Sequence, residues 1–263
     1  MQALRTAATG MAAQQMNVEV ISNNIANMNT VGYKKQRAEF QDLLYQNIRT
    51  PGEDSSDAGT IVPVGVQIGI GVKAAAVYRL SIQGNLSQTG NPLDIAIQGS
   101  GFFQVRLATG QLAYTRDGSF QMDKNGIVVD SSGNPLDPQI TIPPNAQSVT
   151  IATDGTVSYM TPGQTNSQQA GQIQLAMFQN PAGLTSIGQN LYQPTDASGD
   201  ATVAVPGGTE GLGTLMQGYT EQSNVSVVDE FINLIVAQRA YEANSKVVKA
   251  ADEMYQQVNN LKQ

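Results

Sequence analysis

The chain has 263 residues, a formal net charge of −7 and only 13% charged residues, and it contains neither Cys nor His. An acidic chain is a poor ligand for nucleic acid, which is bound by clustered Lys and Arg. Without Cys and His there can be no disulfide, no thiolate or imidazole metal site, and no Ser-His-Asp or Cys-His hydrolase. Composition therefore excludes these kinds of metal site and hydrolase, while an enzyme that uses only Asp and Glu stays open.

The first 30 residues predict a long helix that ends near Asn27. Its apolar side chains follow one another at alternating steps of three and four, which is typical of a narrow coiled-coil seam. A core helix of an ordinary domain is the alternative. Because Arg5 and Glu19 are the only charges in this helix, its outer face favours packing among other helices. The seam consists of Leu4, Ala7, Met11, Gln14, Val18, Ile21, Ile25 and Met28.

The sequence shows no signal that would take the chain into or across a membrane. No apolar run approaches the roughly 20 residues that cross a bilayer. The N-terminal stretch lacks the basic start of a signal peptide, and polar residues between Gln14 and Glu19 interrupt it. Export from the cytoplasm would therefore need a route without a cleaved signal.

Residues 50–72 predict a flexible loop followed by a strand. The loop, 50–60, is acidic and rich in turn residues (TPGEDSSDAGT). From 64 to 72, β-branched residues alternate with Gly65, Gly69 and Gly71, which predicts one strand with an apolar face and a nearly bare face. A bare face allows another backbone to approach closely. We interpret the strand either as a plain buried strand or as a segment wedged between neighbouring subunits.

The middle of the chain predicts an antiparallel β region. Strands are expected at Leu93–Ile97 and Phe102–Leu107, on either side of a glycine turn. From 114 to 219, short β runs alternate with turn dipeptides such as Asn125-Gly126, which indicates a sandwich or an open barrel. Asp94 is interpreted as a structural residue after a turn. Four further aspartates are predicted turn residues rather than calcium ligands, since none lies in an Asp-x-Asp-x-Asp-Gly loop: Asp123, Asp130, Asp137 and Asp154.

Residues 224–263 predict a second long helix. Ser226 followed by Asp229 is a capping signature, and no Gly or Pro interrupts the sequence after it. Such a helix would be roughly 50 Å long. Arg239 and Glu242 stand three residues apart and can pair on one face of it. The seam repeats the N-terminal spacing at Leu234, Ala237, Tyr241, Asn244, Val248, Ala251, Tyr255 and Val258.

Three motifs resemble those of the bacterial flagellar axial proteins of the rod and hook family. The first is Asn23–Lys34 (NNIANMNTVGYK), a specific match over contiguous residues. The second comprises Thr89–Asp94 and Gly99–Phe103, and the third joins Ser223–Val225 to Gln238–Asn244 (QRAYEAN). The motifs occur in the family order and, with the two terminal helices, extend the resemblance over most of the chain.

The resemblance and the residue patterns together predict an α+β, multi-domain protein. Residues 1–30 and 224–263 are expected to form a helical coiled-coil domain. Residues 31–83 are expected to form an extended or β connector domain, and residues 84–223 a β-rich outer domain.

The resemblance implies a structural subunit and not an enzyme, without catalytic residues, cofactor, metal ligands or small-molecule substrate. The chain length and the block Pro63–Val72 most resemble those of subunits of the distal rod of the flagellar basal body. A proximal rod subunit or a hook subunit is the alternative. Copies would stack helically into a rigid tube, with helices inside and β domains outside. This tube would act as a drive shaft that transmits motor torque to the hook.

The implied partners are other copies of the chain, the neighbouring proximal rod and hook proteins, the surrounding basal-body rings, the rod cap and the flagellar type III export apparatus. The implied location is the rod, which spans the periplasm, after export without a cleaved signal peptide. Two other classes stay open. They are a secreted polysaccharide-acting enzyme that uses only Asp and Glu, and an adhesin on the cell surface.

The candidate site residues follow from this assembly. Gly65, Gly69 and Gly71 are predicted to belong to a segment that braces adjacent subunits. The predicted assembly interface consists of Leu4, Met11, Val18, Ile21, Ile25, Met28, Leu234, Tyr241, Val248, Tyr255, Val258, Arg239 and Glu242.

Overall fold

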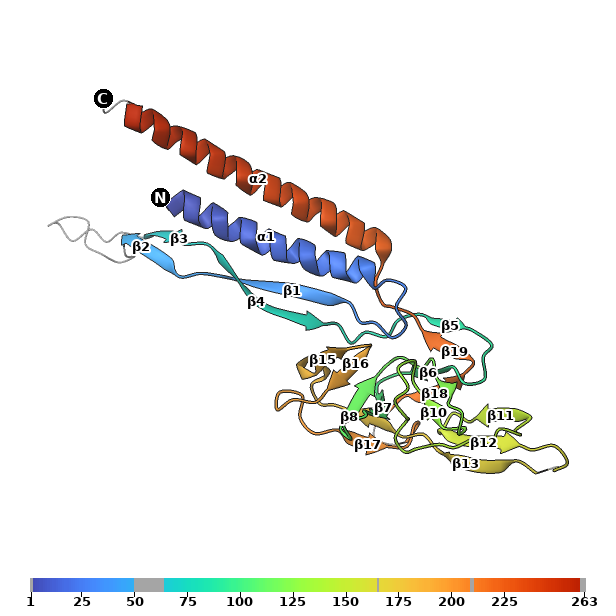
Figure 1. Cartoon of the computed structure of the whole chain (residues 1–263). Helices are drawn as coiled ribbons and strands as arrows, with labels where there is room; N and C mark the ends of the chain where they lie inside the picture. Colours follow the sequence, from blue (N-terminus) through green and yellow to red (C-terminus); the bar gives the residue numbers. More distant parts are fainter. Residues whose placement is uncertain (1, 50–63, 165, 209–210, 261–263) are drawn as a thin grey trace. The chain divides into compact units, whose positions relative to one another are not determined.

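The computed structural model describes residues 2–49, 64–164, 166–208 and 211–260 (Figure 1). The fold is α+β, with a helix near each end of the chain and a mostly antiparallel β region between them, which confirms the predicted class. The chain divides into two compact units. Unit 1 comprises 1–25, 36–78 and 226–263, and unit 2 comprises 26–35 and 79–225. Residues 31–83, predicted to be one connector, are thus shared between both units.

Two long helices belong to unit 1. The helix α1 runs from Gln2–Ala26, and α2 runs from Val227–Asn260. The carbonyl of Ser226 accepts a hydrogen bond from the Glu230 N–H at 3.0 Å, so α2 begins directly after Ser226, as the capping signature predicts. Asp229 and Glu230 lie in its first turn, where carboxylates favour the helix dipole. No helix in the described ranges is long and apolar enough to span a membrane.

Two strand pairs complete unit 1. The strands β1 (Gln36–Asp42) and β4 (Val72–Arg79) pair with each other, and β2 (Tyr45–Arg49) pairs antiparallel with β3 (Val66–Gly69). Figure 1 shows α1 between α2 and the β1–β4 pair. The Asn24 amide fixes the end of α1 to β1, because it accepts from the Gln36 N–H at 2.9 Å and donates to the Gln36 carbonyl at 2.8 Å.

The single strand predicted for 64–72 is wrong, and so is its plain buried interpretation. The strand is interrupted at Ile70 and Gly71, between β3 and β4, and the φ of Gly71 is +138°. A Cβ at Gly71 would lie 2.3 Å from Thr9 Oγ1 of α1, and that hydroxyl accepts from the Val72 N–H at 3.3 Å. The apolar residues of β3 face solvent, since Val66 and Ile68 are 49% and 41% exposed. Alternation alone did not reveal this break in the strand, which lies where the backbone comes close to α1.

The strands of unit 2 are short and are joined by tight turns. A six-stranded sheet has the order β15-β16-β8-β7-β14-β17. Its strands are β7 (Phe102–Arg106), β8 (Leu112–Thr115), β14 (Leu175–Met177), β15 (Thr185–Gly188), β16 (Leu191–Gln193) and β17 (Thr202–Ala204). The smaller sheets contain β5 (Leu86–Gln88), β6 (Ile95–Gln98), β9 (Gln121–Met122), β10 (Val128–Val129), β11 (Ser148–Ile151), β12 (Thr156–Met160), β13 (Gln168–Gln172), β18 (Thr214–Gln217) and β19 (Tyr219–Glu221).

The six-stranded sheet has apolar clusters on both faces. Phe103 is fully buried in the larger cluster and meets Phe120 edge-on at 5.1 Å between ring centroids. Its neighbour Phe102 points to the other face, as successive strand residues must. There it meets Phe178 and Tyr192 edge-on at 5.9 and 6.0 Å. Phe102 and Phe103 of the second motif therefore each contribute a ring to a different apolar cluster.

The turn roles predicted for three aspartates are confirmed. Asp130 Oδ1 accepts from the N–H groups of Ser132 and Asn134, each at 2.8 Å. Asp154 accepts from the Thr156 N–H and hydroxyl at 3.0 Å, and these bonds hold the pKa of its carboxyl below the usual value. Asp123 accepts from the Lys124 N–H at 2.6 Å.

The other two aspartates have side-chain partners. Asp137 pairs with Arg106 at 2.7 Å, a strand residue that the turn interpretation did not foresee. Asp94 accepts from the Thr89 hydroxyl at 2.5 Å and the Asn91 amide at 3.0 Å, both from the preceding turn. These contacts fit the structural role assigned to Asp94.

Candidate assembly surface and buried ion cluster

The two helices of unit 1 approach each other at a few positions, and the coiled coil stays a prediction. Ala7 and Ile21 of α1 are buried, as are Ala237 and Ala251 of α2. The seam residue Asn244 lies against Gly10, because a Cβ at Gly10 would come within 2.9 Å of the Asn244 amide nitrogen. Asn244 thus lies at a point where α2 comes close to α1, and a polar seam residue can fix the register of two helices.

A buried polar contact joins the helices near the end of α1. The Asn24 amide donates to Glu230 Oε2 at 3.2 Å, and both residues are only 1% exposed. Asn24 belongs to the N-terminal motif, and it links α1, β1 and α2 through a single side chain. Periodicity missed it because Asn24 does not belong to the apolar seam.

The predicted interface residues differ widely in exposure. Met28 belongs to unit 2, and the others belong to unit 1. Arg239 and Glu242 form the predicted ion pair at 2.9 Å on the solvent side of α2, with both side chains more than half exposed. The residues that are buried or half-buried are Leu4, Met11, Val18, Ile21, Ile25, Met28, Leu234 and Val248, and the exposed ones are Tyr241, Tyr255 and Val258. Their role between subunits stays a prediction.

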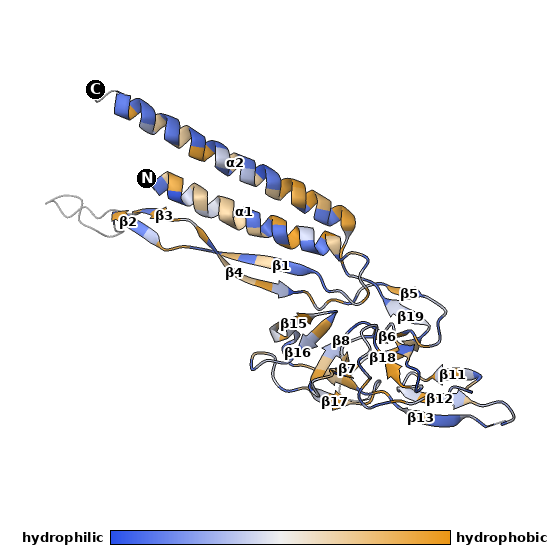
Figure 2. Ribbon diagram, viewed as in Figure 1, coloured by the Kyte–Doolittle hydropathy of each residue, from blue (hydrophilic) through white to orange (hydrophobic). Residues whose placement is uncertain are grey.

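The first turns of α2 carry an exposed apolar surface on the side away from the seam. Val228, Ile232 and Ile235 are spaced by four and three residues, so they share one helix face. They are 68%, 54% and 57% exposed. Phe231 and Val236 flank them and are also exposed, and Figure 2 shows this hydrophobic start of α2. We call these five residues the outer apolar face. Sequence analysis missed it because it followed only the longer seam.

A second exposed apolar surface lies on the β2–β3 hairpin. Tyr45, Ile48, Val66 and Ile68 are all more than 40% exposed. The predicted bracing residue Gly69 lies against Tyr45, since a Cβ there would be 3.4 Å from the ring. Gly71 contacts Thr9 of its own chain, as described above, and the bracing role of both glycines stays a prediction. Much of the predicted loop and bracing segment, 50–63, lies outside the described residues.

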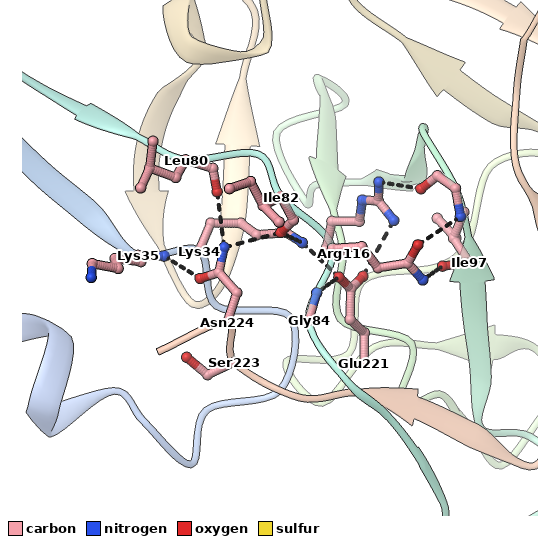
Figure 3. Close-up of polar contacts among 12 residues, drawn as sticks. Lys34, Lys35, Leu80, Ile82, Gly84, Ile97, Arg116, Glu221, Ser223 and Asn224 are labelled. Carbon is pink, nitrogen blue, oxygen red and sulfur yellow. Dashed lines mark hydrogen bonds and ion pairs between the residues drawn. The ribbon is translucent and has the colours of Figure 1, made fainter. Parts of the chain in front are cut away.

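Unit 2 contains a buried ion cluster centred on Glu221 at the end of β19 (Figure 3). Lys34 Nζ lies 2.5 Å from Glu221 Oε1, and Arg116 Nη1 lies 3.2 Å from Oε2. The Gly84 N–H donates to Oε1 at 2.9 Å. All three charged side chains are at most 5% exposed. Buried charged side chains require partners of opposite charge, because an uncompensated charge is costly away from water.

Two glycines allow the backbone to come close to this cluster. Gly32 has φ +69° and donates its N–H to the Glu221 carbonyl at 2.8 Å. A Cβ at Gly32 would lie 2.7 Å from the Arg116 carbonyl carbon, and one at Gly84 would lie 2.0 Å from the Gln222 oxygen. Glycine is therefore required at both positions.

Asn224 ties the same segments together beside the cluster. Its side-chain oxygen accepts from the Lys35 N–H at 2.6 Å, and its amide donates to the carbonyls of Leu80 and Ile82 at 3.0 Å each. Lys34 Nζ also donates to the Ile82 carbonyl at 2.9 Å. The end of the N-terminal motif and the start of the C-terminal motif thus meet at the Ile82 carbonyl in unit 2, a contact between distant residues that local spacing could not reveal.

Burial sets the electrostatics of the cluster. Desolvation lowers the pKa of Lys34, and the nearby Glu221 carboxylate partly opposes that shift. Desolvation likewise lowers the pKa of Arg116, again opposed by Glu221. The described residues contain no group of His, Cys, Asp and Glu side chains that could hold a metal ion. Glu221 thus pairs with two cations, and the cluster holds three segments of unit 2 together.

A helix near each end of the chain and a mostly antiparallel β region between them define the class as an α+β protein with an exposed apolar face on its C-terminal helix. Family models match at 4–34 (Flagella basal body rod protein), 96–159 (Flagellar hook protein FlgE/F/G D1 domain) and 216–261 (Flagellar basal body rod FlgEFG protein C-terminal). The chain belongs to this flagellar rod and hook family, and it is a structural subunit of the distal rod of the flagellar basal body.

Relatives that match this chain over nearly their whole length support this assignment. The chain is 57% identical to the flagellar basal-body rod protein FlgG of Caulobacter vibrioides, over 100% of both chains. It is 46% identical to the protein of that name from Borreliella burgdorferi, over 100% of this chain and 99% of the relative. For the Bacillus subtilis protein of that name the identity is 39%, with the same coverage.

Proposed function

We propose that copies of this chain assemble helically into a rigid tube that transmits motor torque to the hook. The outer apolar face of α2 is the observation that carries this proposal. Exposed apolar surface that adjoins other apolar residues marks an association site in soluble proteins. The opposite side of α2 faces α1, so this face is available for burial against another chain. Identical chains that repeat one such contact form an open helical assembly when the contact does not close into a ring.

The predicted interface residues divide into two roles in this assembly. The seam residues hold α1 and α2 together as a coiled coil within each copy. The exposed residues of α2, with Tyr241, Tyr255 and Val258, contact the helices of neighbouring copies. The Arg239–Glu242 pair orients one copy against the next. An exposed pair contributes at most about 1 kcal/mol to the stability of a single chain, so its proposed role lies between copies.

The segment around Gly65, Gly69 and Gly71 is proposed to brace adjacent copies through the β2–β3 hairpin. The exposed Tyr45, Ile48, Val66 and Ile68 of that hairpin support the proposal. Deletion of Glu53–Gly59 should therefore reduce the rigidity of the rod, measured as bending in electron micrographs. A rod of unchanged stiffness would argue against bracing by this segment.

The further partners and the location follow from the position of a distal rod subunit. They are the proximal rod and hook proteins, the rings, the rod cap and the type III export apparatus, and the rod spans the periplasm.

The double variant Ile232→Ser, Ile235→Ser tests the assembly proposal. Both side chains are more than half exposed, so the free energy of unfolding of the isolated chain should change by no more than about 0.5 kcal/mol per site. Self-association, measured by sedimentation, should be lost. The matched control is Val203→Ser, an exposed apolar residue of unit 2, which should associate like the wild type. Normal association of the double variant would refute the assigned face.

A further inference from the structure

A small pocket lies beside the buried ion cluster of unit 2. Its volume is about 120 Å³, and two of its walls are the cations Lys34 and Arg116, both buried. Phe102 and Phe178 provide buried apolar walls, and the exposed Ser81 and Ser100 provide hydroxyl groups. The pocket therefore combines positive charge, aromatic surface and hydroxyl donors.

The charges at the pocket do not balance. Lys34 and Arg116 are both cationic and share the single carboxylate Glu221. The cluster therefore has one positive charge in excess. Since a buried charge is stabilised mainly by an opposite charge at close range, an anion with one negative charge in the pocket would complete the cluster.

Hydrogen-bond donors also remain on both cations. The Lys34 ammonium has three donor hydrogens and bonds to Glu221 and the Ile82 carbonyl. The Arg116 terminal nitrogens bond to Glu221 and to the Gly99 carbonyl at 2.7 Å. The Arg116 Nε is buried and has no hydrogen-bond partner among the described residues. An unmade bond of this kind is costly, and an oxygen ligand in the pocket could accept it.

We propose that this pocket binds one carboxylate group that carries a short apolar tail. The carboxylate supplies the missing single charge and accepts from the free donors, while the tail packs against the aromatic walls. The volume limits the ligand to a few carbon atoms. Two sources share this chemistry, a free short-chain carboxylate and an acidic side chain of a neighbouring copy. The proposal does not depend on the assembly proposed above.

Thermal unfolding of the full chain in sodium propionate or sodium chloride, at matched ionic strength, tests the proposal. A ligand that binds only the folded state raises the melting temperature as its concentration increases. Propionate should therefore raise the melting temperature relative to chloride. Equal melting temperatures in the two salts would overturn the proposal, as would a larger rise with inorganic phosphate than with propionate.

Two variants separate the pocket from general salt effects. Lys34→Met removes the excess charge and leaves Arg116 paired with Glu221, so the propionate effect should disappear. Ser81→Leu narrows the exposed side of the pocket without touching the ion cluster, and it should abolish the effect with little change of stability in chloride. Lys124→Met, an exposed lysine of unit 2, is the matched control and should keep the full effect. A propionate effect that survives in Ser81→Leu would overturn the assignment to this pocket.

Sedimentation of the wild-type chain with and without propionate distinguishes the two sources of the carboxylate. If propionate weakens self-association, the pocket accepts an acidic side chain of a neighbouring copy. If self-association is unchanged while the melting temperature rises, the ligand is a free carboxylate.

Discussion

Lys34 and Glu221 are separated by 187 positions in the chain, yet their side chains form an ion pair of 2.5 Å that is almost completely buried. Lys34 belongs to the N-terminal motif, and Glu221 lies two residues before the C-terminal one. The pair joins two segments of unit 2 close to residues 35 and 225, after which the chain continues into unit 1.

Glu221→Gln should strongly destabilise the chain. The variant leaves Lys34 and Arg116 buried without a counter-charge, and loss of one partner of a buried pair costs about 3–5 kcal/mol. Urea unfolding should show this loss. The control is Glu242→Gln, which breaks the exposed pair with Arg239 and should cost no more than about 1 kcal/mol. Equal effects of the two changes would contradict the structural role of the buried cluster.

The cost of Glu221→Gln should also depend on pH. Burial lowers the pKa of Lys34, and removal of the carboxylate takes away the charge that opposes this shift. The unfolded chain then binds more protons than the folded chain between the lowered pKa and the ordinary value of 10.5. The unfolding free energy of the variant should therefore approach that of the wild type as the pH rises through this range. A constant difference at all pH values would exclude Lys34 as the cause.

Gly32→Ala should destabilise unit 2 more than an ordinary glycine replacement. The residue has positive φ, and the new methyl group would lie 2.7 Å from backbone atoms of Arg116 and Asp117. Gly133→Ala is the matched control, because its φ is +86° but no atom lies within 4 Å of the new Cβ. The control should lose about 1–2 kcal/mol from backbone strain alone, and Gly32→Ala a further 1–3 kcal/mol, approximately, from the clash. Equal losses of unfolding free energy in the two variants, measured by calorimetry, would mean that the backbone at Arg116 and Asp117 moves aside without cost.

Tyr192→Phe should make the chain more resistant to alkaline unfolding. Burial raises the pKa of Tyr192 above its ordinary value of 10.0, with the cations Arg79 and Arg116 opposing that shift. Below pH 10 the phenol is neutral in both states and contributes nothing to the pH dependence. Above it the unfolded chain loses the proton first, so the unfolding free energy falls as the pH rises toward the raised pKa. Phe keeps the edge-on ring contact and removes this decline. An identical alkaline slope for variant and wild type would contradict the prediction.

Local patterns predicted the helices and most of the β region. The seams around Ala7 and Ala237 and the absence of Gly and Pro after Ser226 were enough to find α1 and α2. Turn dipeptides such as Asn125-Gly126 located the turns, since a positive φ at Gly126 leaves a local signature. The sandwich or open-barrel arrangement of unit 2 and the three predicted domains stay predictions.

What the sequence did not reveal depends on contacts between distant residues. The strand break at Gly71 lies against Thr9, and the ion cluster joins Lys34, Arg116 and Glu221 from three separate segments. A lysine after a turn and a glutamate at the end of a strand look like solvated residues until the fold brings them together. The outer apolar face was visible in the spacing of Val228 and Ile232, but the longer seam on the same helix masked it.

The central claim is that this chain is the structural subunit of the distal rod. Electron microscopy of basal bodies from a strain with the gene deleted in frame tests it most directly. The account predicts rods that stop before their distal part and carry no hook. A rod missing from an earlier point would move the subunit to the proximal rod, and an intact rod without a hook would make it a hook component. Complete basal bodies would contradict the account.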